Sequence, residues 1–158
     1  MTYSSSELST LAAAPMMAGL AVALADFGVV STAIEATAMS KEIASAAQKY
    51  PNNSVIQSVF AEEVIRSGAV QLEKPQVTPE DVQSGAVVDQ AIASIQSALA
   101  ALNGKATDAE IAEYKQLIYT AAEAVANAAG SGLFGSGKTK VSVEEADALS
   151  KLKAALAL

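Results

Sequence analysis

Apolar residues recur every three or four positions through most of the chain, which is the spacing of amphipathic helices. The clearest stripe consists of Val88, Ile92, Ile95, Leu99 and Leu102. Two further stripes consist of Ile111, Tyr114, Ile118, Ala122 and Val125, and of Val143, Ala146, Leu149, Leu152 and Leu156. Nothing in the sequence argues for strands. The pattern predicts an all-α protein in which each helix buries one face.

The predicted helices follow one another with short connectors. Their approximate bounds are Ser5–Asp26, Thr32–Lys49, Ser54–Glu73, Thr78–Leu102, Asp108–Ala129 and a last helix after Ser142. Pro15 is expected to kink or restart the first helix, because proline lacks the N–H that a helix interior uses. We therefore expect one compact bundle of about five to six helices over residues 1–158, with about residues 1–4 flexible and residues 130–141 forming a glycine-rich inter-helix loop.

Capping signals mark most of the predicted helix starts. Four segments have the spacing of a capping box, in which a hydroxyl and a glutamate each bond a free backbone N–H. They are Ser4–Glu7, Thr32–Glu35, Thr107–Glu110 and Ser142–Glu145. Thr78–Pro79 adds a capping residue followed by a proline at the first helical position. These local signals agree with the apolar pattern.

Composition narrows the possible chemistry. Hydrophobic residues make up 51% of the chain, but 35 residues are alanine, so the core is built for close approach of helix backbones. The chain has no His, Cys or Trp and one arginine, Arg66. A Ser-His-Asp triad, a thiolate nucleophile and an ordinary zinc site are thereby excluded. The sequence identifies no catalytic residue and no metal ligand, and it favours a protein that is not an enzyme.

The net charge and one long apolar run indicate whether nucleic acid or a membrane is expected as a partner. A net charge of −7 repels a phosphate backbone, so we expect no nucleic-acid partner. Leu8–Ala25 is an uncharged run of 18 residues, the length at which a membrane span is considered. Pro15 and Gly19 interrupt it, and no Lys or Arg precedes Lys41. We interpret it as a buried core helix rather than a membrane span, in a cytoplasmic protein.

The most specific motif lies before the last helix. Residues 132–139 read Gly-Leu-Phe-Gly-Ser-Gly-Lys-Thr and match the phosphate-binding loop pattern, in which Gly132, Gly137, Lys138 and Thr139 would contact phosphate and Mg²⁺. Such a loop normally joins a buried strand directly to a helix. Here an alanine-rich helix precedes the motif, and the next cap is at Ser142. We therefore favour an inter-helix connector and keep nucleotide or phosphate binding as the alternative.

Other charged groups have structural explanations. Acidic residues cluster in predicted first helical turns, where the helix dipole favours them without a metal. Glu62 and Glu63 are spaced to pair with Arg66 on one helix face, although Arg66 could also anchor an anion. An acid–base role would require Glu35 or Asp26 to be buried and to face a cleft. Glu123 is expected to point to solvent.

Two alanine-rich blocks of the sequence resemble segments of a known protein family. The first runs from Glu7 to Asp26, and the second comprises residues 121–126, the loop around Leu133–Gly135 and residues 141–149. Together they resemble a family of small bacterial all-helical proteins, uncharacterised in function, with a glycine-rich loop before the last helix. The family implies an all-helical fold and brings no activity and no functional residue.

Taken together, these patterns predict a non-enzymatic helical bundle that acts through protein contacts and binds no cofactor. Its small residues suit tight helix pairing within one chain or between two copies in a homodimer. This hypothesis expects exposed apolar residues to gather in one patch. The alternative is a nucleotide, phosphate or other small-molecule binder that uses Gly132–Thr139 and needs a pocket beside that loop.

Overall fold

A computed structural model describes residues 2–25, 32–70, 76–129 and 141–158, and these residues form an all-α bundle with no strand among them. The helices are α1 (Ser5–Ala23), α2 (Thr32–Lys49), α3 (Ser54–Phe60), α4 (Glu62–Ser67), α5 (Pro79–Ser84), α6 (Ala86–Leu102), α7 (Asp108–Ala129) and α8 (Val143–Leu156). The predicted fold class is confirmed. The predicted count of five to six helices is too low for the part of the chain described.

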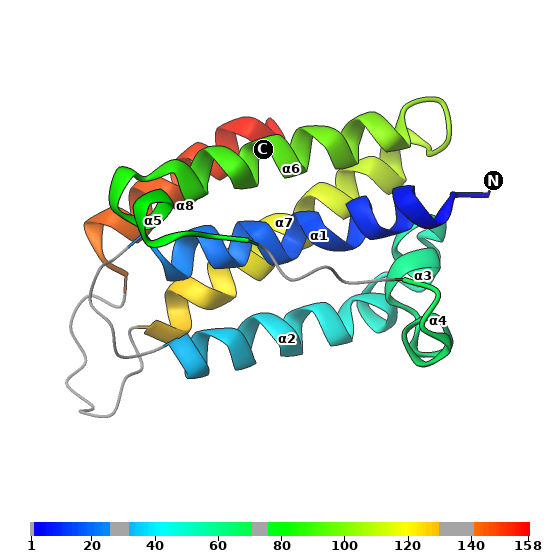
Figure 1. Ribbon diagram of the computed structural model, residues 1–158. Coiled ribbons are helices and arrows are strands. Elements are labelled where there is room, and N and C mark those ends of the chain that lie inside the picture. Colours follow the sequence, from blue (N-terminus) through cyan, green and yellow to red (C-terminus); the bar gives the residue numbers. More distant parts are fainter. Residues whose placement is uncertain (1, 26–31, 71–75, 130–140) are drawn as a thin grey trace.

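Helix α1 lies at the centre of the bundle (Figure 1). It packs mainly against α6 and α7, α2 lies along α7, and α8 packs against both α6 and α7. Small residues make these approaches close. At Gly19 an added Cβ would lie 2.3 Å from the Met39 sulfur, so a larger residue would require the Met39 side chain to shift. The abundance of small residues therefore serves backbone proximity, as the composition predicts.

Helix α1 is also the helix among the described residues whose length and apolar composition would suffice to cross a membrane. Half of that stretch is buried inside the bundle, including Leu11, Ala18 and Val22. The core helices of globular proteins pass the same length test. Its packing agrees with the prediction of a buried core helix.

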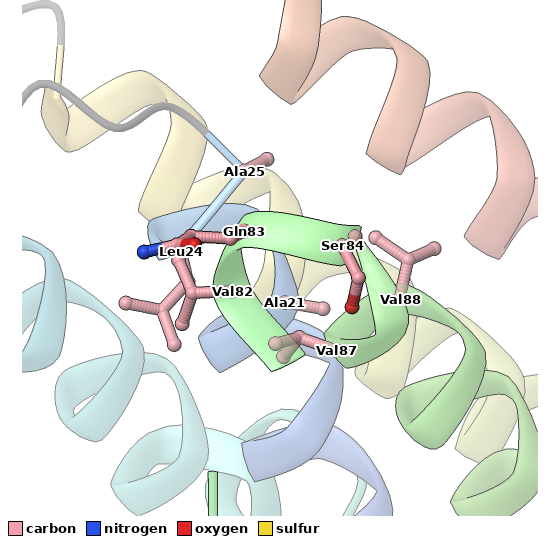
Figure 2. Close-up of a pocket in the computed structure, with 9 residues that line it drawn as sticks. Ala21, Leu24, Ala25, Val82, Gln83, Ser84, Val87 and Val88 are labelled. Atoms are coloured by element: carbon pink, nitrogen blue, oxygen red, sulfur yellow. The ribbon is translucent and has the colours of Figure 1, made fainter. Parts of the chain in front are cut away.

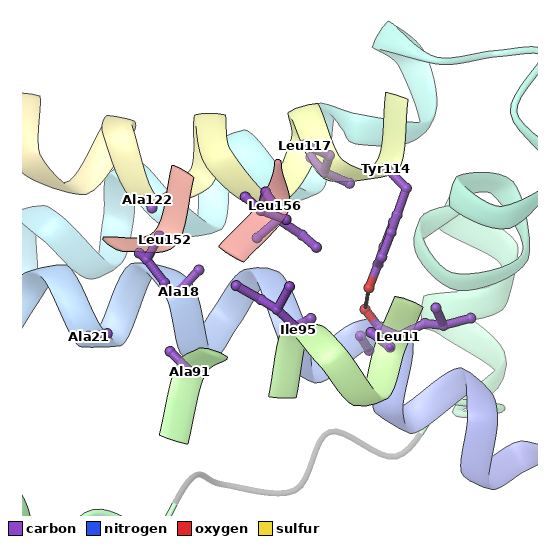
Figure 3. Close-up of a cluster of buried hydrophobic side chains, with 14 of the residues drawn as sticks. Leu11, Ala18, Ala21, Ala91, Ile95, Tyr114, Leu117, Ala122, Leu152 and Leu156 are labelled. Carbon is purple, nitrogen blue, oxygen red and sulfur yellow. Dashed lines mark hydrogen bonds between the residues drawn. The ribbon is translucent and has the colours of Figure 1, made fainter. Parts of the chain in front are cut away.

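Pro15 lies inside α1, which continues past it, so of the predicted kink or restart the restart does not occur. A proline inside a helix leaves the carbonyl four residues earlier without its usual N–H partner. That carbonyl belongs to Leu11, and the hydroxyl of Tyr114 donates a hydrogen bond to it at 2.6 Å (Figure 3). Both residues are fully buried, and burial raises the pKa of the Tyr114 phenol. One side chain of α7 thus supplies the donor that α1 lacks.

Helix starts follow the capping predictions closely. The capping boxes at Ser4, Thr107 and Ser142 form as expected. Thr78 forms a further box, with Asp81 in the place of the glutamate. The side chains of the predicted Thr32–Glu35 box lie outside the described residues. Local side-chain chemistry therefore determines where these helices begin.

Two predicted helices are divided. The helix predicted over Ser54–Glu73 breaks at Ala61, whose backbone is extended, and α4 ends at Gly68 in the left-handed conformation. The helix predicted over Thr78–Leu102 breaks at Gly85, which has a φ of 75°. These breaks account for the higher number of helices. The break at Gly85 also shapes the surface described below.

The buried face of α8 is rotated relative to the predicted stripe. Val143 is 81% exposed, whereas Glu145 is only 4% exposed. The buried positions of α8 are Glu145, Ala148, Leu152 and Leu156. Because Glu145 bonds back to Ser142 in the capping box, the first turn places this side chain against the bundle and Val143 outside it. The prediction of an inward Val143 is wrong.

Candidate functional site

The predicted phosphate-binding residues, Gly132, Gly137, Lys138 and Thr139, lie outside the described residues. The helices on either side of them are described. Helix α7 extends to Ala129, and α8 begins after the N-cap Ser142. The motif therefore follows a helix rather than a buried strand, and the helix after it begins four residues beyond Thr139. This context differs from that of a phosphate-binding loop, as the sequence predicted.

The remaining candidates are charged residues with structural partners or solvent-facing positions. Arg66 pairs with Glu62 in the predicted helix-face arrangement, and both side chains are largely exposed. Glu123 is exposed, as expected. Asp26 and the side chain of Glu35 lie outside the described residues. Within the described part of the chain, no group of three or more Asp or Glu residues is arranged to hold a metal ion.

A hollow with several apolar lining residues is formed where α5 turns into α6 beside the carboxyl end of α1. Thr78 caps α5, Pro79 occupies its first turn, and Gly85 bends the chain into α6. The hollow has a volume of about 260 Å³. We call it the elbow groove, and it is lined by Ala21, Leu24, Ala25, Val82, Gln83, Ser84, Gly85, Val87 and Val88 (Figure 2).

The elbow groove has an apolar floor and accessible walls. Ala21 and Val87 are 1% and 3% exposed, so they form its base, while Leu24, Val82 and Val88 remain partly exposed. Its volume is below the range of about 300–1,000 Å³ typical of small-molecule sites. The groove therefore suits one or two inserted apolar side chains better than a nucleotide or another small molecule.

Acidic residues lie on both helices that form the elbow groove, next to its lining residues in the sequence. Glu80 and Asp81 precede Val82 on α5, and Asp89 follows Val88 on α6. Hydrogen bonds from the Thr78 backbone N–H and hydroxyl lower the pKa of Asp81 below its usual value, so this carboxylate is ionised at neutral pH. Glu80 and Asp89 are exposed. The groove thus has an apolar floor, and the helices that form it carry Glu80, Asp81 and Asp89, which we call the negative rim.

A second hollow of about 420 Å³ lies between the first turns of α1 and the end of α4. Its lining consists of Ser5, Ser6, Ser9, Gly68 and Ala69. No hydrogen bond among the described residues links these serine hydroxyls to a side chain that could act as a base. Without such a base the hydroxyls are weak nucleophiles, and the lining offers no charge with which to hold an anion.

Polar side chains gather at the end of the bundle away from the elbow groove, where α1, α3 and α7 begin (Figure 1). The buried Asn53 caps α3 and donates hydrogen bonds to the Glu110 carbonyl and the Glu113 carboxylate, at 3.0 and 2.8 Å. Glu110 in turn accepts from Ser54 and from its own cap, Thr107. Because Glu110 of α7 accepts the backbone N–H at the start of α3, and Asn53 donates back to α7, the two helices are held together at this end.

Glu7, Lys105 and Tyr3 extend this arrangement. Lys105 forms an ion pair with Glu7, and its ammonium lies 5.7 Å from the centre of the Tyr3 ring. We call Tyr3, Glu7, Asn53, Ser54, Lys105 and Glu110 the cap cluster. The Tyr3 hydroxyl is buried and has no hydrogen-bond partner among the described residues. Burial, together with the nearby charges of Glu110 and Glu7, raises the pKa of Tyr3.

The carboxylates of the cap cluster are held in the ionised form. The hydrogen bond from Lys105 and those from Ser4 lower the pKa of Glu7 to about 2. Hydrogen bonds from Ser54 and Thr107 likewise lower the pKa of Glu110 to about 2. A general acid or base that works near neutral pH needs a carboxyl pKa that is raised instead. The cap cluster therefore has the electrostatics of a structural joint.

The elbow groove was not predicted, because the sequence pattern from Thr78 to Leu102 was interpreted as one helix. The available signal was Gly85, an isolated glycine directly before Ala86, Val87 and Val88. A glycine inside a helical pattern can mark a C-cap, and here it ends α5. The sequence gives no sign that the end of α1 packs against this turn.

Comparisons with known proteins assign neither a family nor a function to the chain. No family model matches the chain, and neither the curated proteins nor the solved structures include a significant match. The resemblance to small bacterial helical proteins therefore remains an expectation and contributes no site residue.

Proposed function

We propose that the protein is a non-enzymatic helical scaffold that acts through protein contacts, with the elbow groove as its contact surface. The observation that carries this proposal is the combination of an apolar floor, accessible valine and leucine walls and a volume below the range typical of small-molecule sites. Recognition of a helix by an apolar groove uses this kind of surface. The groove lies on helices and a defined turn, which favours a preformed site.

The surface distribution of apolar residues favours the groove over a broad patch. The exposed large hydrophobic residues of the described part are Ile65, Val143 and Leu158, which lie on α4, at the start of α8 and at the last position. They do not form the single exposed patch expected for an extensive homodimer. Contact through a recess that receives a partner's side chains is therefore the better-supported form of protein binding.

The proposal is tested with a labelled helical peptide that carries one leucine-rich face and otherwise uncharged glutamine and serine. Fluorescence anisotropy against the full chain is expected to show saturable binding. Val88→Asp places a charge in the groove and is expected to abolish binding. Val143→Asp introduces the same change at a valine outside the groove lining and is expected to leave binding intact.

Two results would overturn the proposal. One is the absence of saturable binding by this peptide and by variants of it with charged flanks. The other is an equal loss of binding in the two aspartate variants, which would show that the peptide does not use the groove. Circular dichroism of both variants checks that the helical fold is retained.

A further inference from the structure

We infer that the partner segment bound by the elbow groove is a basic amphipathic helix, with an apolar face flanked by Lys or Arg. This inference rests on the proposed function and specifies the partner's chemistry. Two independent features point to it: the apolar recess accepts side chains, and the charge around the recess is of one sign. The first feature selects a helix with an apolar face, and the second selects the charge of its flanks.

The segment of the chain that forms α5 and α6 carries acidic residues and no basic ones. Between Lys74 and Lys105 the sequence contains no Lys or Arg, whereas it contains Glu80, Asp81 and Asp89. The two arms of the elbow each provide an exposed carboxylate, Glu80 on α5 and Asp89 on α6. A helix lying in the groove would therefore meet negative charge on both sides.

Helix α8 carries charges of both signs, with acidic residues in its first turns and Lys151 and Lys153 nearer its end. It contributes the exposed Glu144 and Asp147 in its first turns, on the helix that packs against α6. Lys151 of α8 interacts with Asp89 through space, but it is paired with Asp147 at 2.8 Å. Because that lysine is already matched by one acid, the surface keeps an excess of negative charge.

Neither a second copy of the chain nor an anionic surface fits this rim as well. In a symmetric dimer the same patch faces itself, so Glu80, Asp81 and Asp89 would oppose their own copies. Like charges brought together at an interface oppose association. Nucleic acid and anionic lipid are repelled for the same reason. Lys or Arg side chains beside the inserted apolar residues would instead reach the carboxylates while their stems cover apolar surface.

The experiment compares three labelled helical peptides that share one apolar face and carry Lys, Gln or Glu at the flanking positions. Anisotropy titrations with the full chain are expected to give affinities in the order Lys, Gln, Glu. With about three rim carboxylates and modest energies for partly exposed pairs, the Lys peptide is expected to bind about tenfold more tightly than the Gln peptide. High salt is expected to reduce this difference.

Charge-removing variants test the residues responsible. Glu80→Gln combined with Asp89→Asn is expected to weaken the Lys peptide about 3- to 10-fold and to leave the Gln peptide nearly unchanged. The control combines Glu63→Gln with Asp108→Asn, which removes the same charge from exposed sites on α4 and α7, outside the groove lining. It is expected to change neither affinity appreciably.

The outcomes separate this inference from the function on which it rests. Equal binding of the Lys and Gln peptides, or an equal effect of the control variant, overturns the basic partner and leaves contact through the groove standing. A concentration-dependent dimer in sedimentation experiments, lost in Val88→Asp, also overturns it, because a second copy would then occupy the groove. Failure of all three peptides to bind overturns both proposals.

Discussion

The two ends of α1 use charged residues in different ways. At its amino end, Glu7 is held by its cap and by Lys105, within a cluster in which Glu110 of α7 accepts the backbone N–H at the start of α3. At its carboxyl end, about 28 Å away for a helix of 19 residues, the rim acids Glu80 and Asp89 face solvent beside an apolar recess. The first end uses polar groups to join helices, and the second leaves charge and apolar surface accessible to a partner.

This difference implies that substitutions at the two ends should affect different properties. Changes in the cap cluster remove hydrogen bonds that buried groups require, so they should lower the free energy of unfolding. Changes at the groove should alter binding and have small effects on stability, because the side chains involved are partly exposed.

The largest expected effect is that of Asn53→Ala. The change removes the N-cap of α3 and the bonds from the buried Asn53 side chain to Glu110 and Glu113, so the free energy of unfolding should fall by about 2–4 kcal/mol. Urea denaturation measures it. Asn52→Ala, at the exposed neighbouring position, is the control and should change stability by less than about 0.5 kcal/mol. Equal losses would contradict the role given to Asn53.

Tyr114→Phe should lower the free energy of unfolding by about 1–3 kcal/mol, because the Leu11 carbonyl would remain buried without a donor. The cause can be isolated in a Pro15→Ala background. There the new backbone N–H at position 15 can bond the Leu11 carbonyl, so the same tyrosine change should cost less. Identical costs in the two backgrounds, measured by thermal and urea unfolding, would show that the hydroxyl does not replace the missing N–H.

Gly85→Ala probes the elbow itself and should have a smaller effect, about 1 kcal/mol. Gly85 adopts a φ of 75°, a conformation that alanine takes up only with strain. Asparagine tolerates this conformation better, so Gly85→Asn should restore part of the loss in a thermal melt. If alanine and asparagine were equally harmless, the turn between α5 and α6 would not depend on glycine.

Acid titration tests Glu110 in the pH range in which its carboxylate becomes protonated. The folded-state pKa of Glu110 is about 2, below its ordinary value of 4.5, so its contribution to stability is present above pH 4.5 and is lost as the pH falls toward 2. Glu110→Gln should therefore flatten the decline of stability in this window. Glu123→Gln, at an exposed position on the same helix, should leave the decline unchanged. Parallel curves for the two variants would contradict the assignment.

Much of the fold follows from short-range signals. The bounds of α2 and α7 agree with the prediction, and the caps at Ser4, Thr78, Thr107 and Ser142 form as expected. These features depend on side chains within three or four residues of one another. The sequence reports them directly because no distant contact is needed to form them.

The remaining features depend on contacts between distant segments. The continuity of α1 through Pro15 depends on a hydroxyl 99 residues farther along the chain, on Tyr114. The elbow groove likewise forms only where the end of α1 meets α5 and α6. Periodicity places these residues on helices but does not say which helix faces which. The candidate site could therefore not be located from the sequence, although its glycine and valines could be seen there.

The most direct test of the contrast between the two ends is hydrogen exchange of the full chain with and without the Lys-flanked peptide, read segment by segment by mass spectrometry. We predict that the peptide slows exchange in residues 20–25 and 78–90 and leaves residues 50–56 and 105–113 unchanged. Slower exchange at the cap cluster alone, or at neither end under saturating peptide, would contradict the account.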